Sequence, residues 1–165
     1  MSEIKFATIG TSKITKTFLS AASNVPEFKL EATYSRNIKN AIEFGTPYNV
    51  TKFYDSLKAL AEDRTIDAVY IASPNAFHYS QAIQMMKAGK HVLCEKSLAS
   101  NKKEAEEMFR TAAENNVILL EAMRPVFDPG MDAVKASLNK LGVIRRATLN
   151  YCQYSSRYDS FLQGQ

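Results

Sequence analysis

Residues 66–97 have the sequence IDAVYIASPNAFHYSQAIQMMKAGKHVLCEKS, which contains the pattern of one strand–helix–strand unit. The apolar runs Asp67–Ala72 and His91–Cys94 each predict a buried strand. Between them, Ala76–Ala88 predicts a helix, and the glycine that follows, Gly89, is a common residue at the end of a helix. Two apolar strands joined by a helix indicate parallel strands in a sheet that is covered on both faces.

The same alternation of apolar runs and amphipathic stretches extends over residues 1–122. Crossovers between parallel strands are almost always right-handed. The sequence therefore predicts an α/β fold with a doubly wound, Rossmann-type parallel sheet in this region. The further predicted elements are strands at Ile4–Ile9, Leu30–Tyr34, Lys52–Tyr54 and Val117–Leu120, and helices at Ile14–Ala22, at Asn37–Phe44, from a cap at Asp55 or Ser56 to Glu62, and at Asn101–Asn116.

The pattern changes after residue 122. Pro129–Leu141 predicts one more helix, and Ile144–Tyr154 predicts a long strand of partly alternating polarity, as at the start of an antiparallel sheet. We expect residues 123–165 to form a linker helix and the first strand of a truncated C-terminal α+β domain for substrate binding or dimerisation. An unpaired strand would pair with another copy, so the sequence predicts a homo-oligomer through this C-terminal sheet.

The composition is that of an ordinary globular protein, with 45% hydrophobic and 23% charged residues in 165. The 21 lysines and arginines are dispersed apart from two dibasic pairs, which argues against a nucleic-acid-binding surface. No window approaches the roughly 18 apolar residues that a membrane span needs, and the N-terminus lacks a signal-peptide pattern, so we expect a cytoplasmic protein without a membrane partner. The two cysteines, Cys94 and Cys152, form neither a disulfide framework nor a metal-ligand pattern.

The loop after the first strand is a candidate phosphate-binding turn, because parallel sheets of this kind bind ligands beyond the carboxyl ends of their strands. Its sequence is Gly10-Thr11-Ser12-Lys13-Ile14. Of the dinucleotide fingerprint G-x-G-x-x-G/A only Gly10 is present, and Ser12 replaces the second glycine with a hydroxyl that can donate to a phosphate oxygen. Taken alone, the segment fits either a phosphate-binding turn or an ordinary strand-to-helix turn.

The end of the second strand bears on the choice of cofactor. An acidic residue there would bind the ribose 2′-hydroxyl of NAD, but the sequence is Tyr34-Ser35-Arg36-Asn37, without a carboxylate. A serine followed by an arginine can instead receive a 2′-phosphate, since guanidinium is a fixed fork of donors that matches phosphate. The sequence favours NADP, with NAD possible, and the alternative is that Arg36 is a solvated loop residue.

Two further loops carry polar groups at the same predicted edge. Ser73, Asn75 and His78 follow the strand that ends near Ile71, although a histidine at such a helix start is more often structural than catalytic. Glu95 and Lys96 come directly after His91–Cys94. The lysine can pair with the carboxylate or act as a proton donor, and the residues alone leave both interpretations open.

Three motifs together resemble a known family. They are IGTSKI at residues 9–14, DAVYIASPN at residues 67–75 with His78, and AGKHVLCEK at residues 88–96. On these motifs the chain resembles the glucose–fructose oxidoreductase, inositol dehydrogenase and rhizopine-catabolism family of NAD(P)-dependent oxidoreductases. The segment EAMRPVFDP, residues 121–129, is similar to the family's link to its second domain in the dihydrodiol and xylose dehydrogenase branch.

The resemblance implies roles for individual residues. Lys96 would be the catalytic lysine that hydrogen-bonds the substrate hydroxyl near the nicotinamide. Ser97 stands where the family usually has a proline after a cis bond; a cis bond before serine costs about 2.5–4 kcal/mol, so we expect trans here. The implied cofactor-binding residues are Gly10, Thr11, Ser12, Lys13, Ile14, Ser35, Arg36, Ser73, Asn75, His78 and Glu95.

By resemblance, the full-length protein would transfer a hydride between NADP and the hydroxyl-bearing carbon of a sugar, polyol or dihydrodiol. The family's further acid–base motif belongs to its second domain, so we expect residues 1–165 alone to be inactive. The alternative is a non-catalytic module that senses NADP(H) or regulates a partner. A methyltransferase on a similar sheet is disfavoured, because its site also needs a carboxylate at the end of the second strand.

Overall fold

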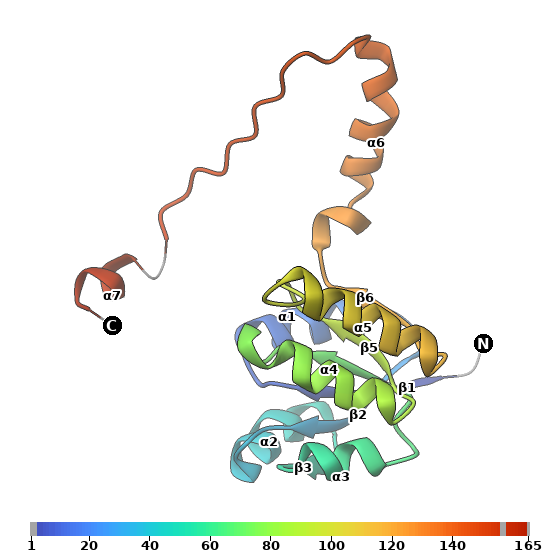
Figure 1. Cartoon of the computed structure of the whole chain (residues 1–165). Coiled ribbons are helices and arrows are strands. Elements are labelled where there is room, and N and C mark those ends of the chain that lie inside the picture. The colour runs from blue at the N-terminus through green and yellow to red at the C-terminus, as the bar shows by residue number, and fades with distance from the viewer. Residues whose placement is uncertain (1–2, 156–157, 165) are drawn as a thin grey trace. The chain divides into compact units, whose positions relative to one another are not determined.

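The computed structural model describes residues 3–155 and 158–164, and it divides into two compact units, residues 1–124 and 125–165 (Figure 1). The first unit contains a six-stranded parallel sheet with the strand order β3-β2-β1-β4-β5-β6. The predicted doubly wound parallel sheet is therefore confirmed. The strands are β1 (Ile4–Ile9), β2 (Phe28–Tyr34), β3 (Lys52–Tyr54), β4 (Ala68–Ile71), β5 (His91–Cys94) and β6 (Leu119–Glu121).

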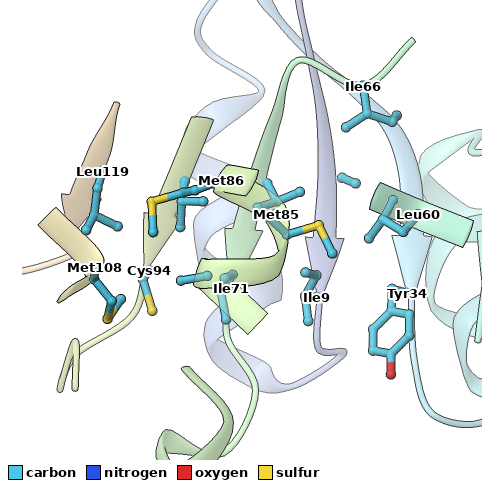
Figure 2. Packing of buried hydrophobic residues seen from close by; sticks show 14 of the residues in the cluster. Ile9, Tyr34, Leu60, Ile66, Ile71, Met85, Met86, Cys94, Met108 and Leu119 are labelled. Atoms are coloured by element: carbon cyan, nitrogen blue, oxygen red, sulfur yellow. The ribbon is translucent and has the colours of Figure 1, made fainter. Parts of the chain in front are cut away.

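Helices cover both faces of the sheet. They are α1 (Lys13–Ala22), α2 (Ile38–Gly45), α3 (Leu57–Glu62), α4 (His78–Lys87) and α5 (Lys102–Glu114). Leu60, Met85 and Met108, from α3, α4 and α5, share one buried cluster with the strand residues Ile9 and Ile71 (Figure 2). The alternate strand residues face α1 and α2, which places these two helices on the opposite face. Burial of both faces explains why the strands are apolar at nearly every position.

Local signals fix the helix ends where the sequence predicted them. The Asn37 side chain accepts a hydrogen bond from the Lys39 backbone N–H (2.9 Å) and begins α2. Ser56, rather than Asp55, caps α3. Gly89 follows α4 with a φ of +78°, a conformation that favours glycine.

The register of the sheet brings the strand ends together at one edge. The last residues of the strands are paired with one another: Ile9 with Tyr34 and with Ile71, Tyr34 with Tyr54, Ile71 with Cys94, and Cys94 with Glu121. All the loops that carry the predicted site residues therefore leave the sheet from this edge.

The second unit differs from its prediction. The helix expected at Pro129–Leu141 is present as α6 (Pro129–Leu138) and a following 3-10 turn, and a short helix, α7 (Tyr158–Leu162), was not predicted. The strand predicted at Ile144–Tyr154 is wrong, because residues 143–155 belong to no strand or helix. A strand exists only where its backbone forms a ladder with a neighbouring strand, and the sheet formed by the described residues contains no strand from Ile144–Tyr154; Leu149, for example, is 92% exposed.

Within residues 3–155 and 158–164, no helix is both long enough and apolar enough to cross a bilayer.

Candidate functional site at the carboxyl edge of the sheet

A cavity of about 430 Å³ opens at the carboxyl ends of β1, β2 and β4. It lies where ligands bind in parallel sheets of this type. Six of the predicted cofactor residues line it: Gly10, Thr11, Ser12, Ser35, Arg36 and Ser73. The structure thus brings together residues from three loops that are up to 63 positions apart in the sequence, Gly10 to Ser73.

Gly10 holds the first loop directly against the loop after β4. Its φ is +111°, and a Cβ atom built on it would lie 2.6 Å from the carbonyl oxygen of Ala72 and 3.1 Å from the backbone nitrogen of Ser73. Both the backbone conformation and the contact exclude a side chain at this position. Gly10 is the one glycine of the dinucleotide fingerprint that this chain retains, and its packing against Ala72 requires a glycine.

The N-terminus of α1 faces the cavity through Ser12. Ser12 is the N-terminal cap residue of α1, and its side chain makes no capping hydrogen bond. The first N–H groups of a helix have no partner within the helix and carry partial positive charge. The turn therefore offers backbone donors and a hydroxyl to an anionic group. The neighbouring Lys13 and Ile14 lie outside the cavity lining, on exposed positions of the first turn of α1.

The rim of the cavity carries a cation beside an aromatic ring. The guanidinium carbon of Arg36 lies 5.8 Å from the centre of the Phe77 ring, within cation–π range. Burial raises the pKa of the Tyr34 hydroxyl above its usual value. The positive charge of Arg36 lowers this pKa in part, and the negative charge of Asp55 raises it further. In the described part of the chain no carboxylate lines the cavity, so its charge is set by Arg36.

Sequence reasoning missed several lining residues. Gln81 lies on α4 and accepts a hydrogen bond through Oε1 from the Ser73 hydroxyl (2.6 Å). It is three positions after His78 and hence on the same face of the helix, a spacing that could have revealed it. Phe77 and Asn40 also line the cavity, but only the meeting of separate loops places them there.

Lys96 lies outside this cavity, in the loop after β5. Its residue is exposed, and among the described residues it forms no ion pair, so the side-chain pair with Glu95 is not observed. Glu95 instead accepts a hydrogen bond from the hydroxyl of buried Tyr70 (2.7 Å) and one from the Lys96 backbone N–H (3.3 Å). Burial and this hydrogen bond hold the pKa of Tyr70 far above its usual range.

His78 is part of the interior rather than of the cavity lining. The side chain is 0% exposed, with Nδ1 2.8 Å from the Ser97 carbonyl oxygen and Nε2 2.9 Å from the Ser73 carbonyl oxygen. Asn75 is exposed and begins the 3-10 turn that precedes α4. A contact of either residue with a cofactor stays a prediction.

The Lys96–Ser97 peptide bond is cis, so the expectation of a trans bond is wrong. The residues around it are held from two sides. The Ser97 carbonyl oxygen contacts His78, and the Leu98 backbone N–H donates to Oε1 of Glu121 (2.9 Å). The sequence could not indicate these contacts, because they come from β6 and α4.

Cys94 behaves as a buried strand residue, as expected. Burial, with the nearby carboxylates of Glu121 and Glu95, raises the pKa of its thiol to about 12. The thiol is therefore neutral at physiological pH and is not a nucleophile.

Comparison with known proteins agrees with this geometry. The model of an oxidoreductase family with an NAD-binding Rossmann fold matches residues 4–123. The chain belongs to this family. It is the glucose–fructose oxidoreductase, inositol dehydrogenase and rhizopine-catabolism family, so the resemblance based on three motifs is confirmed.

The chain is similar to several dehydrogenases and to a solved ketoreductase. It is 50% identical over 161 residues to scyllo-inositol 2-dehydrogenase (NADP(+)) IolU of Bacillus subtilis (strain 168), covering 98% of this chain and 49% of that protein. It is 30% identical over 141 residues to trans-1,2-dihydrobenzene-1,2-diol dehydrogenase of Xenopus tropicalis, covering 84% of this chain and 43% of that one.

The solved structure is that of KijD10, a 3-ketoreductase from Actinomadura kijaniata in complex with TDP-benzene and NADP. It matches with a TM-score of 0.79 and 30% identity over 87% of this chain and 45% of its own. The chain thus spans about half the length of the relatives it matches.

Proposed function

We propose that the full-length protein is an NADP-dependent oxidoreductase that transfers a hydride between the cofactor and a hydroxyl-bearing carbon of a sugar, polyol or dihydrodiol. The observation that carries the proposal is the cavity in which the Gly10–Ser12 turn and the Ser35–Arg36 pair meet, with no carboxylate among the described residues that line it. The relatives named for inositol and dihydrodiol oxidation support the substrate class.

The residues of the cavity fit a dinucleotide phosphate. The backbone N–H groups at the start of α1 and the Ser12 hydroxyl would hold the pyrophosphate, and Gly10 allows the tight turn that presents them. Ser35 and Arg36 would hold the 2′-phosphate, and Arg36 forms no ion pair within the described residues that would compete. NAD would lose this contact and is the secondary cofactor.

Lys96 is proposed as the catalytic residue. The bound nicotinamide would supply the hydride chemistry. The Lys96 amine would hydrogen-bond the substrate oxygen, take its proton during oxidation and return it during reduction. The exposed lysine in the loop after β5 is free to face a substrate, because Glu95 is held by Tyr70 instead.

One observation favours the alternative of a non-catalytic NADP(H) sensor. The dinucleotide-type residues line the cavity, whereas Lys96 lies outside it. A sensor would bind NADPH without turning over any hydroxyl compound.

Two measurements test the proposal. Titration of the protein with NADPH and with NADH, followed by cofactor fluorescence, should give tighter binding of NADPH. Turnover of a panel of inositols, sugars and dihydrodiols by the full-length protein should be linked to NADP. Tight NADPH binding without any turnover would support the sensor, and a preference for NADH would contradict the assignment of Ser35 and Arg36.

The assignment of residues 123–165 to the start of a second domain, homo-oligomer formation and a cytoplasmic location stay predictions. Residues 1–165 alone should bind the cofactor without catalysis. Without a second domain, the nicotinamide would have no wall to exclude water and no second acid–base group opposite Lys96.

A further inference from the structure

His78 bridges the two loops that the proposed function needs to keep in register. It is the first residue of α4, and its ring is completely buried. On one side Nε2 lies 2.9 Å from the carbonyl oxygen of Ser73, in the loop after β4. On the other side Nδ1 lies 2.8 Å from the carbonyl oxygen of Ser97, in the loop after β5.

Both partners of the ring are hydrogen-bond acceptors. A neutral imidazole has one N–H group and donates to one carbonyl at a time, whereas the imidazolium donates to both. Neither ring nitrogen is directed to the cavity, which His78 does not line. Both hydrogen-bonding atoms of the side chain therefore contact backbone carbonyl groups of this chain.

The loop at the Ser73 end forms one wall of the cofactor cavity. Ser73 lines the cavity, its backbone nitrogen is packed against Gly10, and its hydroxyl donates to Gln81. The position of its carbonyl group therefore fixes the wall that faces the proposed pyrophosphate site.

The loop at the Ser97 end carries Lys96. It is also held at Glu95 by the Tyr70 hydroxyl and at Leu98 by the Glu121 carboxylate. The contact with His78 lies between these two points, next to the lysine. Of these three contacts, the one with His78 connects the loop to Ser73, which lines the cofactor cavity.

We propose that His78 is a positioning residue that sets Lys96 relative to the cofactor cavity by holding the carbonyl groups of Ser73 and Ser97 together. The inference rests on the proposed function, because it assumes that the cavity holds the cofactor and that Lys96 acts on the substrate. It assigns His78 a role between two loops, where the family resemblance implied a contact with the cofactor itself.

Two variants divide the bridge into its halves. The amide nitrogen of asparagine stands close to the position of Nδ1, and that of glutamine close to the position of Nε2, and each is a donor. His78→Asn therefore keeps the contact with Ser97 and loses the one with Ser73. His78→Gln keeps the contact with Ser73 and loses the one with Ser97.

In the full-length protein both variants should lower kcat, and only His78→Asn should also weaken cofactor binding. His78→Gln should bind NADPH like the wild type but lose about 10–100-fold in kcat, since a small misplacement of a reacting group has this effect. His78→Asn should lower kcat to a similar extent, because releasing either end breaks the bridge, and it should also weaken NADPH binding by about 3–10-fold, the scale of one lost hydrogen bond to the cavity wall. In a Lys96→Met background, His78→Gln should cause no further loss of kcat.

Equal effects of the two variants on both quantities, or no effect of either, would overturn the inference. If the variants do not fold, hydrogen exchange of the wild-type protein decides. NADPH should then protect the amides of residues 98–101 together with those of Ser73 and residues 75–77, and protection confined to residues 10–15, Ser73 and residues 75–77 would overturn it. Failure of the proposed function looks different, because the wild-type protein would then lack NADPH binding or turnover.

Discussion

Replacing Gly10 by alanine should destabilise the protein strongly, because two penalties coincide at this position. A non-glycine residue at a positive φ such as +111° costs about 1–3 kcal/mol. The new Cβ would also lie 2.6 Å from the Ala72 carbonyl oxygen, a backbone atom that cannot turn away. Forcing an extra methyl group into a packed site costs about 1–3 kcal/mol more. The expected loss is about 2–6 kcal/mol, against a typical stability of about 5–15 kcal/mol.

The chain offers a matched control in Gly89. Its φ is +78°, but none of the residues that the structure describes places an atom within 4 Å of a Cβ built there. Gly89→Ala should therefore show the conformational penalty alone, about 1–3 kcal/mol. Urea unfolding followed by far-ultraviolet circular dichroism measures both variants, and the difference between them isolates the contact with Ala72.

The same pair of variants also tests the site. Gly10→Ala should weaken NADPH binding, because Gly10 lines the cavity, whereas Gly89→Ala should leave the affinity unchanged. If the two variants lose equal stability and bind NADPH equally well, the close packing of the first loop against Ala72 is not what selects glycine at position 10.

Three further substitutions have defined outcomes. Arg36→Ala should lower NADPH affinity by about 1–3 kcal/mol and leave NADH affinity nearly unchanged, as titration would show, and equal losses for both would refute a 2′-phosphate contact. Lys96→Met in the full-length protein should keep NADPH affinity and slow hydride transfer by about 10²–10⁴-fold, whereas normal turnover would exclude its catalytic role. Burial opposes ionisation of Asp63, but hydrogen bonds from Tyr54, Thr65 and Lys52 outweigh it and hold the pKa of its carboxyl well below the usual range. Because this pKa is lower in the folded state than in the unfolded state, the ionised Asp63 carboxylate stabilises the fold above about pH 4, and this stabilisation is lost as the pH falls further. Asp63→Asn should therefore make the free energy of unfolding depend less on pH in the acid range. An unchanged pH dependence would contradict this assignment.

The sheet could be predicted from the sequence because its determinants are local and repeated. Apolar runs such as Ala68–Ile71 are buried on both faces, and this burial is visible in their composition alone. The edge at which ligands bind follows from the parallel topology. The sequence alone therefore predicts Gly10, Ser35 and Arg36 as cofactor-binding residues, and the structure places all three in the lining of one cavity.

The remaining features depend on contacts between segments distant in sequence. His78 was identified as a candidate, but its two partners lie in different loops, and no periodicity encodes that geometry. Phe77 lines the cavity beside Arg36, a residue 41 positions earlier in the sequence, and no local pattern indicates that the two meet. The prediction of a strand at Ile144–Tyr154 was wrong for the same reason. Alternating polarity describes the side chains of a segment and does not reveal whether another strand is available to pair with it.

The contrast between the two cysteines gives the chain a built-in reporter of unfolding. Cys94 is enclosed in the core with a thiol pKa raised to about 12, whereas Cys152 is exposed to solvent. A thiol reagent added to the folded chain should therefore modify Cys152 quickly and leave Cys94 unmodified until the sheet opens. The slow second phase of labelling would measure the opening of the parallel sheet directly, without a probe that perturbs the site.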